Sequence, residues 1–333
     1  MKECRMTDRF GDCAVERTLG AGAMGTVYLV RSPDGERYAL KVLNPEIARL
    51  HPEFKHRFTR EAEFAMTLHH RNLIPVHDAG EDPERGFCYI LMDYLPGGSV
   101  KERVCAQGRL PVDKAVSIAI SVAGALEVAH YHGVVHRDIK SENILFDADG
   151  TPKLADLGVA RFKDATHPGT MRGGILGTPA YMAPEQMLDA HCIDARADIY
   201  SLGVVLYEML AGAGPYEKLS TMEVLARAIR GDSLPDVRTA CPDVPAEVAY
   251  VLSRMVAQKP EDRPATVREV ADLLARAVSG TLQIPASTPA VAPAPPPVPF
   301  WRKPLFAVAM AAVAVAVAAL AFAYCVWSRS RGT

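Results

Sequence analysis

The stretch "VVHRDIKSEN", residues 134–143, places a dense group of polar side chains directly after two valines. It contains Arg137, Asp138, Lys140 and Asn143 within seven residues. A buried strand or helix would continue with apolar residues, so the chain is expected to leave regular structure here. Loops held by a rigid scaffold often carry binding and catalytic side chains, and the rest of the sequence must show whether this one does.

Composition limits the classes of protein that fit. The chain has 333 residues, of which 49% are hydrophobic and 23% charged, enough for a large core and about two domains. The net charge of -2 provides no basic field for nucleic acid, so we expect no nucleic-acid partner. Seven scattered cysteines, without a C-x-x-C pair, argue against a disulfide framework or zinc knuckle and favour a reducing cytosol. The N-terminus lacks the apolar core of a signal peptide.

The C-terminal part has a different character. Residues 280–304 are rich in Pro and Ala, which predicts a semi-extended linker. Residues 305–327 contain no charge, Pro or Gly, and as a helix they would extend about 34 Å, against a hydrocarbon core of about 30 Å. A soluble helix would need a polar face, which this segment lacks. We therefore expect one transmembrane helix at 305–327, followed by a short extracytoplasmic tail at 328–333.

The hydrophobic pattern changes once between residues 10 and 279. Residues 10–96 hold short β patterns, "TVYLV", "RYALKVL" and "FCYILMDY", and one charged helical stretch, which predict a small antiparallel lobe with one long helix. The sequence "SPDGE", residues 32–36, predicts a tight hairpin turn. Residues 97–279 are dominated by long helical patterns and predict a larger helical lobe. A cleft between two such lobes is a usual place for a small-molecule site.

"LGAGAMGTVY", residues 19–28, has the spacing G-x-G-x-x-G at Gly20, Gly22 and Gly25. The same spacing occurs in dinucleotide-binding folds, where the third glycine opens a helix. Here β-branched and aromatic residues follow, so the glycines are expected between two strands, where the backbone can approach phosphate oxygens. A glycine-rich hairpin without a ligand is the alternative. Lys41 follows Gly25 by 16 residues, on the next strand, and favours the phosphate interpretation.

Taken together, "GAGAMGTV", "YALK", "HRDIKSEN", "DLG" (156–158) and "APE" (183–185) resemble the protein kinase signature set in order and spacing. The chain resembles bacterial Hanks-type, membrane-anchored serine/threonine kinases over residues 10–279. The resemblance implies an α+β, two-lobed protein kinase fold. It also implies transfer of the γ-phosphate of ATP to protein Ser/Thr hydroxyls, with ATP and Mg²⁺, or Mn²⁺, as cofactors. The kinase domain is then expected on the cytoplasmic side of the cell membrane, where ATP is found.

The resemblance assigns catalytic roles within the stretch 134–143. Asp138 resembles the base that orients and deprotonates the attacking hydroxyl, and Lys140 the residue that steadies the γ-phosphate. Asn143, together with Asp156 from the next motif, would hold Mg²⁺.

The resemblance also assigns a nucleotide pocket. Lys41 would bind the α- and β-phosphates and pair with Glu61, while Glu63 is the second choice because it points to another face of the helix. Met92 would guard the adenine pocket. The backbone of residues 93–95 would bond the edge of adenine. The predicted nucleotide-binding residues are Leu19, Gly20, Gly22, Gly25, Val27, Ala39, Lys41, Glu61, Met92, Asp93 and Leu95.

Three further matches are structural. Glu185 and Arg263 are expected to form a buried ion pair, Asp198 to brace the catalytic loop, and His136 to support backbone. A metal site formed by His130, His132 and His136 is the alternative, but no cysteine or carboxylate completes it at ligand spacing.

A regulatory phosphate is expected in the activation segment, because Arg137 directly precedes the base. The candidates are Thr166, Thr170 and Thr178. Thr178 is assigned by resemblance to the substrate site, so Thr170 is the first choice and Thr166 the second. Modification in trans would involve a homodimer.

A pseudokinase scaffold that binds nucleotide or partners is the second hypothesis from the sequence. Pseudokinases generally lack one of the positions occupied here by Lys41, Asp138, Asn143 and Asp156, so an active enzyme is favoured.

Overall fold

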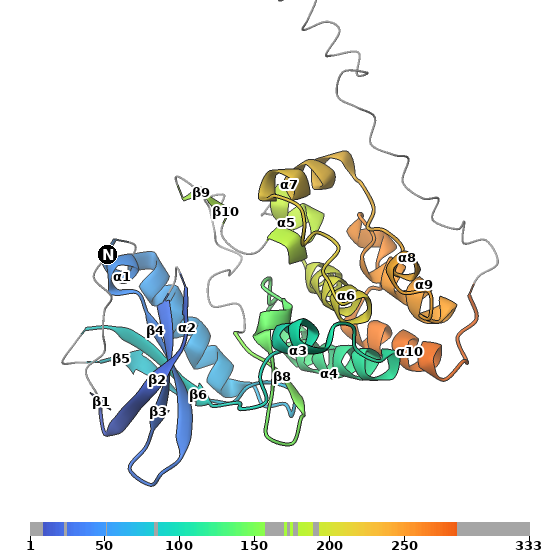
Figure 1. Cartoon of the computed structure of the whole chain (residues 1–333). Helices are drawn as coiled ribbons and strands as arrows, with labels where there is room; N and C mark the ends of the chain where they lie inside the picture. The colour runs from blue at the N-terminus through green and yellow to red at the C-terminus, as the bar shows by residue number, and fades with distance from the viewer. Residues whose placement is uncertain are drawn as a thin grey trace, which may run out of the picture. The chain divides into compact units, whose positions relative to one another are not determined.

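The computed structural model describes residues 9–22, 25–50, 52–82, 86–156, 170–171, 174–175, 179–188 and 193–284 (Figure 1). The segment 1–288 forms one compact unit. The predicted transmembrane helix at 305–327 and most of the predicted linker lie outside the described residues. Among the residues that are described, no helix combines the length and apolarity needed to cross a bilayer.

The first lobe is built on a six-stranded sheet, with the strand order β1-β2-β3-β4-β6-β5 and antiparallel pairing throughout. Its strands are β1 (Arg9–Phe10), β2 (Cys13–Gly22), β3 (Gly25–Arg31), β4 (Arg37–Leu43), β5 (Val76–Glu81) and β6 (Cys88–Asp93). This confirms the predicted antiparallel lobe and the strands expected from "TVYLV", "RYALKVL" and "FCYILMDY".

Strands β3 and β4 form the centre of this lobe because their β-branched and aliphatic residues are covered on both faces. Val30 and Leu40 are fully buried. The hairpin between the strands is closed by a hydrogen bond from Ser32 N to Glu36 O at 2.9 Å. Gly35 adopts a φ of 94° there, which a residue with a side chain adopts only with strain. The turn predicted from "SPDGE" is therefore confirmed.

Two helices, α1 (Pro45–Leu50) and α2 (Pro52–Thr67), follow β4. Helix α2 lies beside the sheet (Figure 1) and packs against β5 and β6. Its apolar side is anchored by Phe58 and Ala62, which are 2% and 1% exposed. The single long helix predicted for this lobe is confirmed, and the short α1 precedes it.

The second lobe is mainly helical, as predicted. Its helices are α3 (Val100–Gln107), α4 (Val112–Tyr131), α5 (Pro184–Leu188), α6 (Arg196–Ala211), α7 (Thr221–Arg230), α8 (Val237–Ala240), α9 (Ala246–Met255) and α10 (Val267–Val278). The two-stranded hairpin of β7 (Ile144–Phe146) and β8 (Pro152–Leu154) lies beside α4, and short strands β9 (Thr170–Met171) and β10 (Gly174–Ile175) pair with each other.

Helix α6 is the centre of the helical lobe. Every residue from Ala197 to Leu210 is buried, including the charged Asp198 and Glu208, so the helix is packed on all sides. Helices α4 and α9 pack against it. The glycine within it, Gly203, allows this approach, since a Cβ there would lie 2.6 Å from Val256 Cγ1. The rigid α4–α6 pair supports the polar loop that precedes β7.

Candidate active site

Asp198 holds the backbone of the loop that precedes β7. Its carboxylate accepts hydrogen bonds from the N–H groups of His136 and Arg137, both at 2.8 Å, and lies 2.7 Å from His130 Nε2. Arg137 has a φ of 64°, a left-handed conformation that costs a non-glycine residue roughly 1–2 kcal/mol. Because Asp198 sits on the buried helix α6, it fixes this strained loop. The bracing role predicted for Asp198 is confirmed.

The side chain of Asp138 projects from this loop and has two polar neighbours. Asn143 Nδ2 donates to the Asp138 carbonyl at 2.9 Å and to its Oδ2 at 3.2 Å. Lys140 Nζ lies 2.9 Å from the same Oδ2. The short 3-10 turn Ser141–Asn143 brings Asn143 back toward Asp138. The carboxylate is thus oriented by an amide and accompanied by a cation, and it remains 35% exposed.

Asp156 lies directly after β8 and pairs with Lys41 of β4, at an Nζ–Oδ1 distance of 2.6 Å. Burial opposes ionisation of this carboxyl, but Lys41, together with His136 and Lys140, outweighs burial, so the pKa of Asp156 is lowered from its usual value. Asp156 therefore carries a negative charge at neutral pH. Its φ of 57° is again left-handed.

The two segments that carry Asn143 and Asp156 are joined by backbone contacts. Ala155 N donates to Asn143 O at 2.8 Å, and the buried ring of His136 donates from Nε2 to Ala155 O at 3.2 Å. His136 thus supports backbone, as predicted. These contacts place the segments of Asn143 and Asp156 side by side, and amide and carboxylate oxygens are donors of the type that Mg²⁺ prefers. The donor set fits the predicted metal.

The residues predicted to surround adenine form one apolar cluster. Ala39 and Met92 are neighbours across β4 and β6, and both belong to a buried cluster that also includes Ala155. Leu19, Val27 and Leu95 are partly buried against this same cluster. Residues from separate segments of the chain therefore surround one apolar region close to Lys41 and Asp156.

Packing explains why glycine is needed at one of the three positions of the first motif but not at the other two. A Cβ on Gly25 would lie 2.1 Å from the carbonyl oxygen of Val42, whereas Cβ atoms on Gly20 and Gly22 would meet nothing within 4 Å. Gly22 pairs with Gly25 across the β2–β3 hairpin, which confirms that the motif lies between two strands. Gly25 is thus required by close packing against β4, and only Gly20 and Gly22 leave open space.

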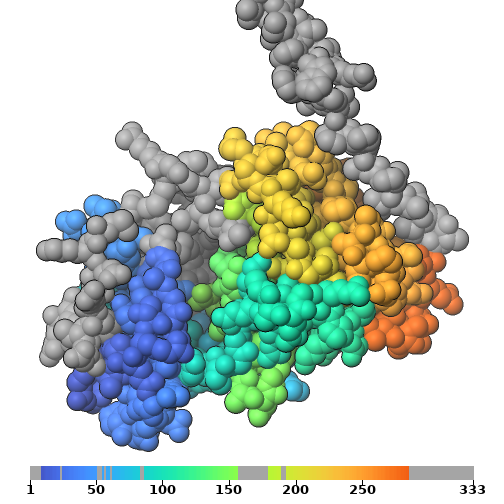
Figure 2. Space-filling view, viewed as in Figure 1, coloured from blue at the N-terminus to red at the C-terminus, as the bar shows by residue number. Residues whose placement is uncertain are grey.

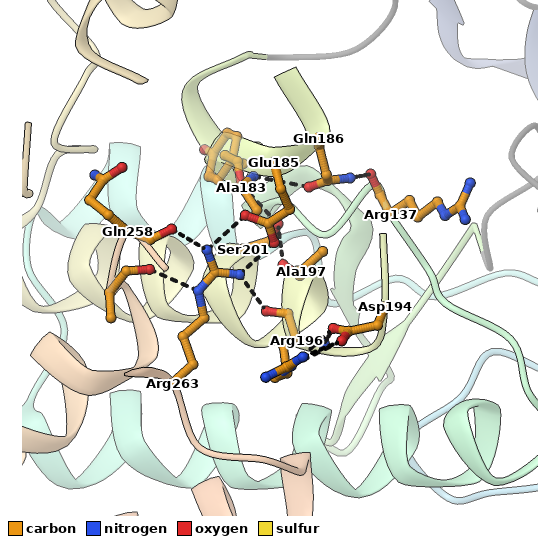
Figure 3. A network of polar contacts seen from close by, with 12 residues as sticks. Arg137, Ala183, Glu185, Gln186, Asp194, Arg196, Ala197, Ser201, Gln258 and Arg263 are labelled. Atoms are coloured by element: carbon orange, nitrogen blue, oxygen red, sulfur yellow. Dashed lines mark hydrogen bonds and ion pairs between the residues drawn. The ribbon is translucent and has the colours of Figure 1, made fainter. Parts of the chain in front are cut away.

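A buried ion pair links α5 to the C-terminal part of the helical lobe. Arg263 Nη1 and Nη2 lie 2.6 and 2.8 Å from the two carboxylate oxygens of Glu185, which confirms the predicted pair. Figure 3 shows the guanidinium group between Glu185 and the carbonyl of Arg196, to which it also donates. The neighbouring Gln186 donates to Arg137 O at 3.2 Å (Figure 3). This last contact ties α5 to the loop of Asp138, and the sequence did not predict it.

Several predicted residues cannot be placed. The side chain of Glu61 in α2 is outside the described part of the chain, and Glu63 is exposed, so the partner of Lys41 on this helix stays a prediction. Leu157, Gly158, Thr166 and Thr178 lie outside the described residues. Only the backbone of Thr170 is described, in β9.

Sequence reasoning missed a second polar chain beside this site. Ser141 Oγ and Tyr181 Oη are 2.9 Å apart, and Tyr181 donates to the buried Glu208 at 2.7 Å. Lys101 of α3 completes the chain at 2.8 Å from Glu208. Each of these residues looks ordinary in its own segment, and their positions in the sequence gave no signal that they meet.

Comparison with known proteins agrees with this geometry. The model of the protein kinase domain family matches residues 13–274. The chain is 36% identical to serine/threonine-protein kinase PknB of Mycolicibacterium smegmatis over 261 residues, covering 77% of this chain and 41% of that protein. It is also 36% identical to PknJ of Mycobacterium bovis over 312 residues, covering 90% and 52%.

The crystal structure of the PknI kinase domain of Mycobacterium tuberculosis superposes with a TM-score of 0.65 at 34% identity, covering 82% of this chain and 99% of that one. The chain spans about half the length of these curated relatives, or less. The family match covers the sheet, the helical lobe and the loop between them that carries Asp138. The chain therefore belongs to the protein kinase family, among relatives that are bacterial serine/threonine protein kinases.

Proposed function

We propose that this chain transfers the γ-phosphate of ATP to serine or threonine hydroxyls of protein substrates. The observation that carries the proposal is the convergence of three segments, which carry Lys41, Asp138 with Asn143, and Asp156. Lys41 lies 2.6 Å from Asp156, Asn143 is hydrogen-bonded to Asp138, and Ala155 N donates to Asn143 O. Phosphoryl transfer depends mainly on positioning and on stabilising charge, with little covalent chemistry by the protein. This arrangement supplies fixed charges of both signs around one point.

The proposed roles follow from these contacts. Asp138, oriented by Asn143, accepts the proton of the attacking hydroxyl. Lys140 lies next to Asp138 and is placed to move to the phosphoryl oxygens when substrate enters. Lys41 positions the α- and β-phosphates, and the open space at Gly20 and Gly22 leaves room for backbone to approach them.

The proposed metal site consists of Asn143 and Asp156. When bound there, Mg²⁺ supplies positive charge that offsets the charge developing on the phosphates. Asp156 can serve as a ligand because Lys41, with His136 and Lys140, outweighs burial, lowers its pKa and favours its ionised form. The nucleotide ring occupies the apolar cluster of Ala39, Met92 and their neighbours.

The direct test incubates the purified chain with γ-labelled ATP, MgCl₂ and a mixed-sequence protein substrate. Phosphoserine or phosphothreonine should accumulate in the substrate, and omission of the divalent metal should abolish it. Nucleotide binding without any transfer would contradict the proposed activity and favour the scaffold hypothesis.

We also propose that the enzyme phosphorylates its own activation segment, at Thr170 before Thr166. The support is the sequence: Arg137 precedes the base, and Thr170 lies in the Gly-containing "HPGTMRGG". A phosphate carries about -1.5 to -2 charges and can make one to three charge-assisted hydrogen bonds with arginine. Mass spectrometry of the active preparation should find phosphate at Thr170, and Thr170→Ala should lower turnover more than ATP affinity. An unmodified segment in a fully active preparation would overturn this proposal.

Anchoring by residues 305–327, with the kinase domain in the cytoplasm, is a further proposal. Its support is the uncharged apolar composition of this segment and the need for cytosolic ATP. After cell fractionation, the full chain should be found in washed membranes. A version ending at Pro285 should be soluble and active, and its retention in the membranes would contradict this segment as the sole anchor.

A further inference from the structure

A cavity of about 280 Å³ lies in the helical lobe, next to the loop of Asp138. It is lined by the segment Pro179–Tyr181, by α6, and by residues 214–224, which lead into α7. In Figure 2 the blue-green surface of α3 and α4 adjoins the yellow surface that leads into α7. This volume, which is open with Lys101 in place, lies just below the roughly 300–1,000 Å³ typical of small-molecule sites.

Most of the described residues that line this cavity are uncharged, and the charged ones are three acids and a single cation. Three carboxylates line it, those of Glu142, Glu208 and Glu217, together with the ammonium group of Lys101. The side chain of Glu208 is fully buried, while those of Lys101 and Glu217 are 29% and 50% exposed. Lys101 Nζ lies 2.8 Å from Glu208 and 3.4 Å from Glu217. A buried carboxylate is costly unless it is paired, so Lys101 is the cation that Glu208 requires.

The charge of Lys101 is secured by these contacts. Burial disfavours its ammonium form, but the hydrogen bond and ion pair with Glu208 outweigh burial and raise the pKa of Lys101. Tyr181 donates a second hydrogen bond to Glu208 at 2.7 Å. Glu208 is thereby held between a phenol and an ammonium group.

The cavity adjoins the loop that carries Asp138. Glu142 follows Asp138 by four residues, and the buried Ser141 connects the same loop to Tyr181 at 2.9 Å. A polypeptide that brings its hydroxyl to Asp138 therefore places the neighbouring residues within reach of this cavity. An acidic cavity at such a position would select a substrate with Lys or Arg near the phosphoacceptor.

We propose that Lys101 is a specificity-determining residue that neutralises the carboxylates of this cavity from within the chain. Its ammonium group pairs with carboxylates that a basic substrate side chain would otherwise bind, so the enzyme accepts substrates without Lys or Arg beside the phosphoacceptor. Removal of the Lys101 ammonium group leaves the three carboxylates of the cavity without this cation. An arginine of the substrate can then form a bidentate pair with one of these carboxylates. The inference rests on the proposed kinase activity.

The test compares kcat/KM for two sets of serine peptides, with arginine or alanine at each position flanking the phosphoacceptor. For the parent, kcat/KM for the arginine and alanine peptides should differ by less than about threefold at every position. Lys101→Met should prefer arginine at one position by roughly 10- to 100-fold, the range for a hydrogen bond to a charged group. Lys101→Arg should restore the parent pattern, since it keeps the cation. Lys114→Met is the matched control: it removes an exposed lysine of α4 that does not line the cavity and should leave the ratios unchanged.

A second measurement does not depend on catalysis. Agmatine, a guanidinium compound, should raise the melting temperature of Lys101→Met and leave that of the parent unchanged. Equal arginine/alanine ratios in Lys101→Met and parent, or no agmatine effect on the variant, would overturn the inference. If Lys101→Met does not fold, the parent protein alone still tests the inference, because a strong arginine preference in the parent contradicts a cavity whose carboxylates are neutralised by Lys101. If the parent transfers no phosphate to any peptide, the proposed kinase activity fails, and the agmatine measurement still decides whether the cavity accepts a basic group.

Discussion

The ammonium group of Lys41 lies 2.6 Å from the carboxylate of Asp156, although 115 residues separate the two in the sequence. The pair joins β4 to the segment after β8, and it brings the cation proposed to bind phosphate next to the anion proposed to bind the metal. Lys41→Met should therefore lower phosphoryl transfer by at least about 100-fold, the scale on which misplacing a reacting group acts. Circular dichroism should be unchanged, since Lys41 is not part of the apolar core. Transfer at the parent rate would contradict the role given to Lys41.

The same pair predicts a dependence of stability on pH. Burial raises the pKa of Asp156, but Lys41, with His136 and Lys140, outweighs burial and lowers it, so the contribution of Asp156 to stability is present above its usual pKa of about 3.9 and is lost as pH falls through the lowered value. Lys41→Met removes the largest of the lowering causes, so the pKa of Asp156 should rise relative to the parent. The free energy of unfolding of Lys41→Met should therefore fall further below the parent's at pH 7 than at pH 4. Urea titrations at both pH values check this, and a pH-independent difference would contradict it.

Arg263 is expected to be a major contributor to stability. Its fully buried side chain pairs with Glu185 and donates to three backbone carbonyls. Arg263→Met leaves a largely buried carboxylate and three carbonyls without their partner, and should cost about 3–5 kcal/mol in urea unfolding. The control is Arg268→Met, which removes an exposed ion pair with Glu127 and should change stability little. Equal losses in the two variants would show that burial does not set the strength of the Arg263 pair.

Much of the fold was predictable because its central elements have strong periodicity. "RYALKVL" and "DIYSLGVVLYEMLAG" predicted β4 and α6, whose residues are largely buried. Strand β5, "VHDAGE", was not predicted, because it lies at the edge of the sheet and its exposed His77 and Asp78 break the alternation. Its strand geometry comes from pairing with β6, which is a tertiary effect.

The site was predictable only in part. Motif resemblance, rather than periodicity, predicted that Lys41, Asp138, Asn143 and Asp156 belong to one site. The contact between Lys101 and Glu208 joins residues 107 positions apart, and each would be unremarkable on its own helix. For Gly25, the motif predicted a residue of the site but not the reason for it. The motif was assigned to phosphate binding, whereas the structure requires this glycine for packing against β4.

Gly25 and Gly20 should therefore differ in their sensitivity to substitution. In Gly25→Ala the new Cβ would lie 2.1 Å from Val42 O, so β3 or β4 must shift, at a cost of about 1–3 kcal/mol typical of overpacking. Gly20→Ala meets open space and should leave stability unchanged while weakening ATP binding. Thermal unfolding and nucleotide titration separate the two effects. A loss of stability in Gly20→Ala but not in Gly25→Ala would contradict the packing role given to Gly25 and the binding role given to Gly20.

The rate of phosphoryl transfer by Asp138→Asn, measured beside the parent at saturating ATP and Mg²⁺, tests the central claim most directly. Asparagine keeps the size of the side chain but cannot accept the proton, so turnover should fall by about 10²- to 10⁴-fold. The melting temperature and the affinity for ATP should stay close to the parent values, which excludes unfolding as the cause. Turnover near the parent rate in a folded Asp138→Asn would contradict Asp138 as the base and, with it, the proposed chemistry of the site.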